Sequence, residues 1–116
     1  MKHHPANALR TEKAQSYSHL ESMAVRLQLV NPGAEPWTAA GAVLKDSTGA
    51  EVELSPWQES VILPGVPGFV VVGAERDPRQ LGCPCTLKLW EAQGPRTVTL
   101  GDVSFPDAKQ DPAPES

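Results

Sequence analysis

The two cysteines are the side chains with the most distinctive chemistry in this sequence. Cys83-Pro84-Cys85 places two thiols two residues apart. Alternate residues of a strand point to the same side, but a bond between them would close a small strained ring, and Pro84 stiffens the backbone between them. A thioredoxin-type pair has two intervening residues at the start of a helix. We therefore expect two small structural thiols at the entrance of a strand, with a redox or metal site at Cys83 and Cys85 as the alternative.

Other groups that could do chemistry are sparse. A zinc site at the two cysteines would need two further fixed ligands. The histidines are His3, His4 and His19, and all lie in the N-terminal fifth of the chain. The acidic residues fall at expected turns and strand edges, where solvated carboxylates are common. We therefore expect no enzyme, and no catalytic, cofactor-binding or metal-binding residues.

Three tryptophans lie outside the stripes of residues that we expect to be buried. Trp37 falls in a loop, Trp57 is out of phase with the apolar residues before it, and Trp90 lies with Lys88 on the polar face of a hairpin. Tryptophan combines a large apolar area with one hydrogen-bond donor and often anchors interfaces. We therefore predict a partner surface that includes Trp90, Lys88, Trp57 and Trp37. The alternative is that loops or the N-terminal segment fold over the rings.

Residues 85–106 contain the clearest structural pattern, a hairpin. Leu87 and Leu89 alternate with polar residues, as do Val98 and Leu100 after the break at residues 92–95. This period of two is typical of strands with one solvated face. The four-residue loop predicts three opposed pairs: Leu89 with Val98, Leu87 with Leu100, and Glu91 with Arg96. The outward face then carries Lys88, Trp90, Thr97 and Thr99.

The rest of the chain also favours short strands. Its 116 residues suit one domain, and its 12 prolines and 9 glycines separate apolar runs. Strands are expected around residues 23–29, 42–44, 52–54, 61–63 and 69–72. Pro56 should end the ladder of the strand at 52–54, and the strand at 69–72 should be covered on both faces. The sequence thus predicts an all-β fold, an antiparallel two-sheet immunoglobulin-like sandwich of about seven strands. We place this domain at residues 17–106, after a flexible segment (1–16) and before a disordered tail (107–116).

The charge and hydropathy patterns narrow the possible partners. The formal net charge is −4 and the ten basic residues are scattered, which argues against nucleic-acid binding. No apolar run approaches the roughly 20 residues that cross a bilayer, so no membrane insertion is expected. The first residues do not form a secretory signal, and the chain as written is expected to be cytoplasmic.

Three blocks of the sequence carry a family resemblance: RLQLVNPGAEPWTAAGAVL (26–44), ILPG followed by FVVV, and TLKLWEAQGPRTVTLGDVSFP (86–106). They resemble the C-terminal domain of a paralogous family of myxobacterial proteins, domain of unknown function 2381. The likeness covers about residues 17–106 and is most specific in the LKLWE and RTVTL blocks. Members typically have an export signal, an N-terminal β domain and a charged helical segment before this domain, so the resemblance implies export to the envelope. It supplies no activity and no catalytic residue.

The interpretation that follows is a non-catalytic β-sandwich that acts as a binding or assembly module. Its expected partner is protein, either a second copy or another chain. A redox or metal site at Cys83 and Cys85 is one alternative. A small-ligand carrier is another, and it would require a cavity between the sheets.

Overall fold

The computed structural model of the chain describes residues 2–3, 7–58 and 60–106. These residues form eight strands and one short 3₁₀ helix. The elements are β1 (Lys2–His3), β2 (Arg10–His19), β3 (Ser22–Val30), β4 (Ala39–Lys45), β5 (Glu51–Trp57), β6 (Gly68–Ala74), η1 (Pro78–Gln80), β7 (Cys85–Glu91) and β8 (Thr97–Val103). The expectation of an all-β fold is therefore confirmed.

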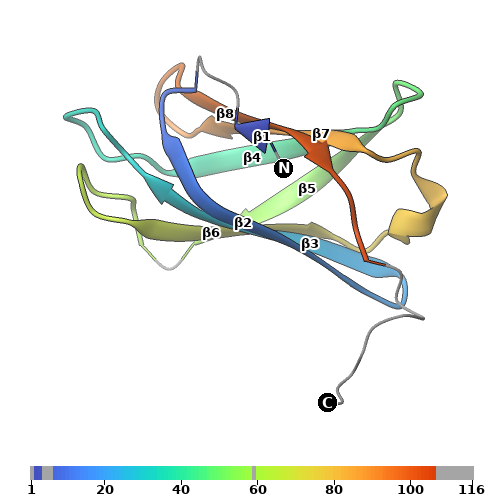
Figure 1. Cartoon of the computed structure of the whole chain (residues 1–116). Helices are drawn as coiled ribbons and strands as arrows, with labels where there is room; N and C mark the ends of the chain where they lie inside the picture. The colour runs from blue at the N-terminus through green and yellow to red at the C-terminus, as the bar shows by residue number, and fades with distance from the viewer. Residues whose placement is uncertain (1, 4–6, 59, 107–116) are drawn as a thin grey trace.

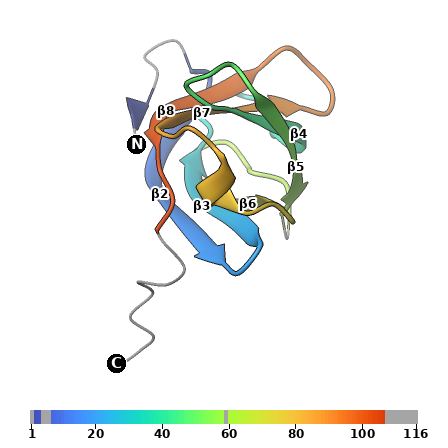
Figure 2. The same cartoon turned by 90° about the vertical axis from the view of Figure 1, so that its right-hand side faces the viewer.

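All eight strands belong to one antiparallel sheet with the order β1-β8-β7-β4-β5-β6-β3-β2. Viewed from the end, the strands surround a common core in a nearly closed, barrel-like ring (Figure 2). Strands β4, β7 and β8 form one wall, β2, β3 and β6 form the other, and β5 crosses between them (Figure 1). The structure thus differs from the expected two-sheet sandwich, because β5 joins the two walls into a single sheet.

Strand β5 changes its partner halfway along its length. Its first half pairs with β4 as far as Leu54 opposite Ala42, and its second half pairs with β6 from Ser55 to Trp57. Pro56 was expected to end the strand, but it lies inside β5, opposite Val72. Proline is tolerated here because the strand is leaving one neighbour for the other.

The barrel closes along a seam where side chains take the place of a backbone ladder. Ser16 Oγ donates a hydrogen bond to the carbonyl of Ser104 at 2.5 Å, and Ser18 Oγ donates to the carbonyl of Pro106. Ahead of β2, the side-chain amide of Asn7 donates to Thr99 O and accepts from Thr99 N, each at 2.8 Å. These bonds join β2 to the residues that follow β8, and the segment before β2 to β8 itself.

The N-terminal boundary also differs from the expectation. Residues 10–16 were placed in a flexible segment, but they form most of β2, and Leu9 is only 1% exposed. The inward positions of β2 carry Ala14, Ser16 and Ser18, opposite the inward residues of β3. Small and hydroxyl-bearing residues give no apolar alternation, so the hydropathy pattern of the sequence does not predict this strand. Residues 107–116, the expected tail, lie outside the described residues.

The core is built from residues that alternate along the strands. The predicted register of the β7–β8 hairpin is confirmed, with Leu89 opposite Val98 and Leu87 opposite Leu100. Strand β6 was expected to be covered on both faces. Instead it alternates, because Val70 and Val72 point inward while its other face is partly exposed. The buried hydrophobic residues are Leu9, Met23, Val25, Leu27, Leu29, Trp37, Ala42, Leu44, Val52, Leu54, Ile62, Val70, Val72, Cys85, Leu87, Leu89, Val98, Leu100 and Val103.

The segment between β5 and β6 is a loop rather than the expected strand at 61–63. Among the described residues, residues 61–63 make one strand-like contact, a bridge between Ile62 and Trp37. The expected turn at Pro64-Gly65 is present: Gly65 has φ +76° and Val66 N donates to Leu63 O at 3.2 Å. A positive φ at the third residue is the reason that glycine stands there.

The hairpin register predicts a contrast between two neighbouring residues. Leu89→Ala should lower the free energy of unfolding by about 2–5 kcal/mol, because it empties a fully buried position. Trp90→Ser should lower it by only about 1 kcal/mol, because the ring lies outside the sheet. Urea unfolding of both variants checks this. A Trp90 variant less stable than the Leu89 variant would contradict the outward position of the ring.

Candidate functional site

An apolar surface lies on the outside of the sheet across β5, β6 and β3. Trp57 pairs with Val71, and Val71 pairs with Arg26 on its other side. Phe69 precedes Val71 by two residues on the same strand, so both side chains face the same way. We call Trp57, Phe69, Val71 and Arg26 the Trp57 face. The strand register alone makes these four residues neighbours.

The two rings of the Trp57 face are open to solvent. Trp57 is 63% exposed and Phe69 is 43% exposed. The guanidinium carbon of Arg26 lies 4.2 Å from the centroid of the Phe69 ring, within the range of a cation–π contact. Aromatic residues and arginine are enriched in the centres of protein interfaces. The Trp57 face therefore has the composition of a protein-binding surface.

Trp90 and Lys88 lie on the outside of β7, as the hairpin register predicted. The ring of Trp90 covers Gly41 of β4: a Cβ atom on Gly41 would lie 2.4 Å from Cζ2 of the ring. Lys88 is exposed between Val43 and Thr99. Gly41 thus provides room for the indole to lie across the neighbouring strand, and the ring remains 38% exposed.

Trp37 is a correction to the predicted surface, because it is fully buried. Its backbone pairs with Ile62 through hydrogen bonds of 3.0 and 2.9 Å, and its indole N–H donates to Arg96 O at 3.4 Å. The ring belongs to the buried hydrophobic core. Trp57 and Trp90 lie on strands separated by β4 in the sheet order. The four predicted residues are therefore not one surface.

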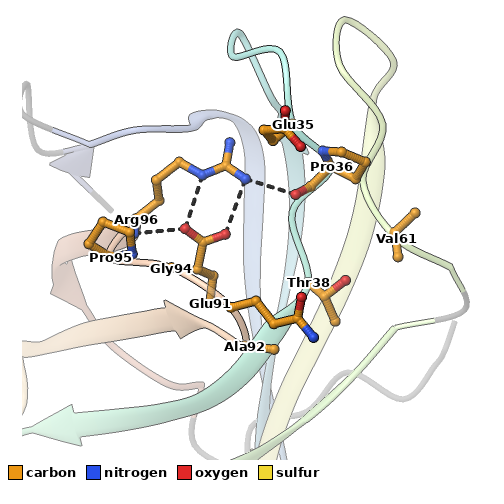
Figure 3. A pocket seen from close by; sticks show the side chains of 10 residues that line it. Glu35, Pro36, Thr38, Val61, Glu91, Ala92, Gly94, Pro95 and Arg96 are labelled. Atoms are coloured by element: carbon orange, nitrogen blue, oxygen red, sulfur yellow. Dashed lines mark hydrogen bonds and ion pairs between the residues drawn. The ribbon is translucent and has the colours of Figure 1, made fainter.

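A cleft of about 620 Å³ opens at the turn of the β7–β8 hairpin (Figure 3). Arg96 and Glu91 form a forked ion pair in its wall, with Nε to Oε1 at 3.0 Å and Nη2 to Oε2 at 3.1 Å. The backbone N–H of Arg96 also donates to Oε1 at 2.9 Å. The lining residues are Glu35, Pro36, Thr38, Val61, Glu91, Ala92, Gln93, Gly94, Pro95 and Arg96.

Arg96 extends this pair into a wider polar network. Its guanidinium donates to the carbonyl of Pro36 at 2.8 Å and to Oδ1 of Asn31 at 3.2 Å. Asn31 is fully buried. Its side-chain amide donates to Glu35 O at 2.6 Å and to Ile62 O at 3.3 Å. The network joins the hairpin, the segment after β3 and the loop after β5.

The electrostatics of the cleft favour a structural pair over an acid or base. Hydrogen bonds from the Arg96 side chain lower the pKa of Glu91, and this outweighs the burial that raises it. A Cβ atom on Gly94 would lie 2.4 Å from Oε1 of Glu91, so glycine leaves the space that the carboxylate occupies. Both carboxylate oxygens already accept hydrogen bonds. The expected pairing of Glu91 with Arg96 is thus confirmed, and it is an ion pair that joins the two strands of the hairpin next to its turn.

The cysteines are a second correction, because Cys83 and Cys85 form a disulfide bond with each other. The expectation of two unlinked thiols assumed strand geometry, in which alternate residues lie about 6.6 Å apart. Strand β7 begins only at Cys85, and the residues before it bend. The Cα atoms are therefore 4.4 Å apart, at the short end of the usual disulfide range.

Asp46 anchors the segment that enters the disulfide. Its Oδ2 accepts from Gly82 N at 3.0 Å, and its Oδ1 accepts from Thr48 N at 2.9 Å and from Ala50 N at 3.0 Å. Ser47 N and Oγ both donate to Gly82 O, at 2.8 and 2.5 Å. The hydrogen bond from the Thr48 hydroxyl is the largest cause that lowers the pKa of Asp46 to about 2, followed by the bond from Gly82. The β4–β5 turn thus holds the residue that precedes Cys83.

The histidine, cysteine and acidic side chains do not form a metal site in the part of the chain that the structure describes. No three side chains of His, Cys, Asp or Glu within it are close enough to hold an ion. His19 is exposed at the end of β2. Among the same residues, no helix is long and apolar enough to span a bilayer.

The fold and its surface features define a small all-β domain with a single barrel-like sheet. The profile of the family described as "Protein of unknown function (DUF2381)" matches residues 3–103. The chain therefore belongs to this family. No curated protein and no solved structure matches the chain.

The low pKa of Asp46 predicts a pH dependence of stability. A carboxyl whose pKa is about 2 in the folded state stabilises the fold fully above its unfolded pKa, and this contribution is lost as the pH falls from about 4 towards 2. Asp46→Asn should therefore be less stable than the parent at pH 7 and should lose less stability between pH 4 and 2. Urea unfolding at several pH values measures how the free energy of unfolding of the parent and of Asp46→Asn changes with pH. Glu53→Gln, which removes one exposed carboxylate of β5, is the control for the loss of one negative charge.

The Arg96 network predicts an unequal response to two arginine substitutions. Arg96→Ala removes the side-chain hydrogen bonds to the buried Glu91 carboxylate and to Oδ1 of the buried Asn31, so the free energy of unfolding should fall by about 1–3 kcal/mol. Arg10→Ala breaks an ion pair with Glu12 whose side chains are 64% and 39% exposed, and it should cost less than about 1 kcal/mol. Thermal and urea unfolding compare the two. Equal losses of unfolding free energy in the two variants would contradict a stabilising role of the Arg96 network.

Proposed function

We propose that this domain is a non-catalytic binding or assembly module that binds a protein partner through the Trp57 face. The observation that carries the proposal is the exposure of Trp57 and Phe69 beside Val71 on one continuous stretch of the outer surface. Apolar rings that cluster outside a sheet cost solvation free energy unless a partner covers them. Membership of the family supplies no activity, so the proposal rests on this surface.

The chemistry of the Trp57 face suits a protein partner. The indole and the phenyl ring supply apolar area with few rotatable bonds, and Arg26 adds charge beside them. Such residues dominate the binding energy of many protein interfaces. The formal net charge of −4 and the single arginine of this face do not match the requirements of a nucleic-acid phosphate backbone.

The polar groups of the cleft support a non-catalytic role. Glu91, Arg96 and Asn31 are hydrogen-bonded to one another and to backbone carbonyls. A general acid or base needs a group that can reach the substrate and exchange its proton there. Here the same groups hold three chain segments together. We further propose that the domain is the C-terminal part of longer myxobacterial proteins, as the resemblance of its sequence implies.

A photo-crosslinking experiment tests the role of the Trp57 face. Benzoylphenylalanine is placed at position 57, and in a separate chain at position 20, in cells that normally make the protein. Leu20 is 67% exposed at the β2–β3 turn, so it is a matched apolar control away from the face. Irradiation should join a defined protein to position 57 and not to position 20. The same adducts at both positions, or none at position 57, would contradict the proposal.

The binding of the captured protein to the purified domain then measures how much Trp57 contributes to the affinity. Trp57→Ser should weaken the binding by about thirtyfold, which corresponds to the 2 kcal/mol or so of an interface hot spot. Leu20→Ser should leave the dissociation constant unchanged. Both variants should unfold within about 0.5 kcal/mol of the parent, since both side chains are exposed. If the captured protein is a second copy of the chain, sedimentation should show a dimer that Trp57→Ser dissociates.

A further inference from the structure

The two sulfur atoms of the Cys83–Cys85 disulfide lie in different surroundings. Cys85 is 1% exposed and belongs to the buried core. Cys83 is half-buried and lines an open surface cleft of about 270 Å³, whereas Cys85 does not line it. The other lining residues are Pro78, Arg79, Leu81, Ser104, Phe105 and Pro106. A reactant from solvent can therefore approach one sulfur and not the other.

The bond links two residues of one short segment. Cys83 and Cys85 are separated by two positions in the sequence. A disulfide restricts the unfolded chain by closing a loop, and the effect grows with the length of that loop. A loop of three residues gains little, and the bond connects no two separate elements of the fold. Holding the barrel together is thus a poor explanation of this disulfide.

The cysteines would stay close together without the bond. On one side, Gly82 is fixed by hydrogen bonds from its N–H to Asp46 and from Ser47 to its carbonyl. On the other side, Cys85 is paired with Val103 in the β7–β8 ladder. Opening the disulfide therefore leaves both thiols in position to close it again.

We propose that Cys83–Cys85 is a reversible thiol–disulfide exchange site for small thiols, with Cys83 as the sulfur that is attacked. The thiolate of a small thiol bonds to Sγ of Cys83, and the bond between the two cysteine sulfurs breaks. Its electron pair leaves on Sγ of Cys85, which takes a proton from water. A second thiol then attacks the mixed disulfide, releases the small-molecule disulfide and leaves two reduced cysteines. A small-molecule disulfide reverses the sequence and oxidises the pair.

This site is independent of the proposed partner surface. The Trp57 face contains neither cysteine, and binding through it requires no redox step. Failure of the exchange experiment below would leave the proposed binding function untouched, and loss of the binding function would leave the exchange site untouched.

Incubation of the native protein with glutathione tests the proposal. After reduced glutathione, mass spectrometry should show that iodoacetamide alkylates Cys83 in the native protein and Cys85 only once the protein is denatured, while near-ultraviolet circular dichroism before denaturation stays native. Adding glutathione disulfide should restore the bond. Reduction that occurs only in denaturant, or that unfolds the protein, would show a structural disulfide and overturn the proposal.

Single variants test which sulfur is attacked. With glutathione disulfide, Cys85→Ser should form a mixed disulfide at Cys83, and Cys83→Ser should form one at Cys85 at least about tenfold more slowly, because thiol reactivity requires access. Equal rates would refute the assignment of Cys83. The double variant Cys83→Ser/Cys85→Ser should keep the native circular dichroism spectrum and melt within a few degrees of the parent. The glutathione experiment on the parent needs no variant, so poor folding of a single variant does not prevent the test.

Discussion

The guanidinium of Arg96 holds together one end of the barrel. It binds Glu91 across its own hairpin, and it reaches Asn31 and the carbonyl of Pro36 in the segment after β3. Asn31 in turn donates to Ile62 in the loop after β5. Asn31 and Glu91 are buried, so each depends on this network for its hydrogen bonds. The hairpin and two long connections therefore share one arrangement, and the cleft beside them is a consequence of it.

The Trp57 face depends on how β5 passes between the two walls. The strand leaves β4 after Leu54 and joins β6 from Ser55 onward, which brings Trp57 beside Val71. Directly after the strand, Gln58 accepts a hydrogen bond from the backbone of β4. This hydrogen bond fixes the chain against β4 directly after Trp57, while the ring of Trp57 stays on the outside of the sheet. A binding surface on paired strands is more rigid than one on a loop, and this reduces the entropy lost on association.

Strand β7 has different chemistry at its two ends. Cys85 begins the strand and is bonded to Cys83, whereas Glu91 ends it and belongs to the Arg96 network. The disulfide is held in place by the β4–β5 turn through Asp46, and the ion pair is held by the segment after β3. A change at one end therefore need not disturb the other. The disulfide and the Arg96 network are thus two separate local features at opposite ends of one strand.

The all-β class and the register of the β7–β8 hairpin can be predicted from the sequence, because alternation and loop length are local properties of the chain. The sequence also placed Trp90 outside and Glu91 opposite its ion-pair partner. The joining of two walls into one sheet by β5 depends on long-range strand pairing, because a change of strand partner leaves no mark in the hydropathy pattern. The burial of Trp37 and the inward position of Ser16 likewise depend on segments far away in the sequence. The same holds for Cys83: its spacing from the second cysteine is local, but contacts with the β4–β5 turn fix the backbone that brings the two sulfurs together.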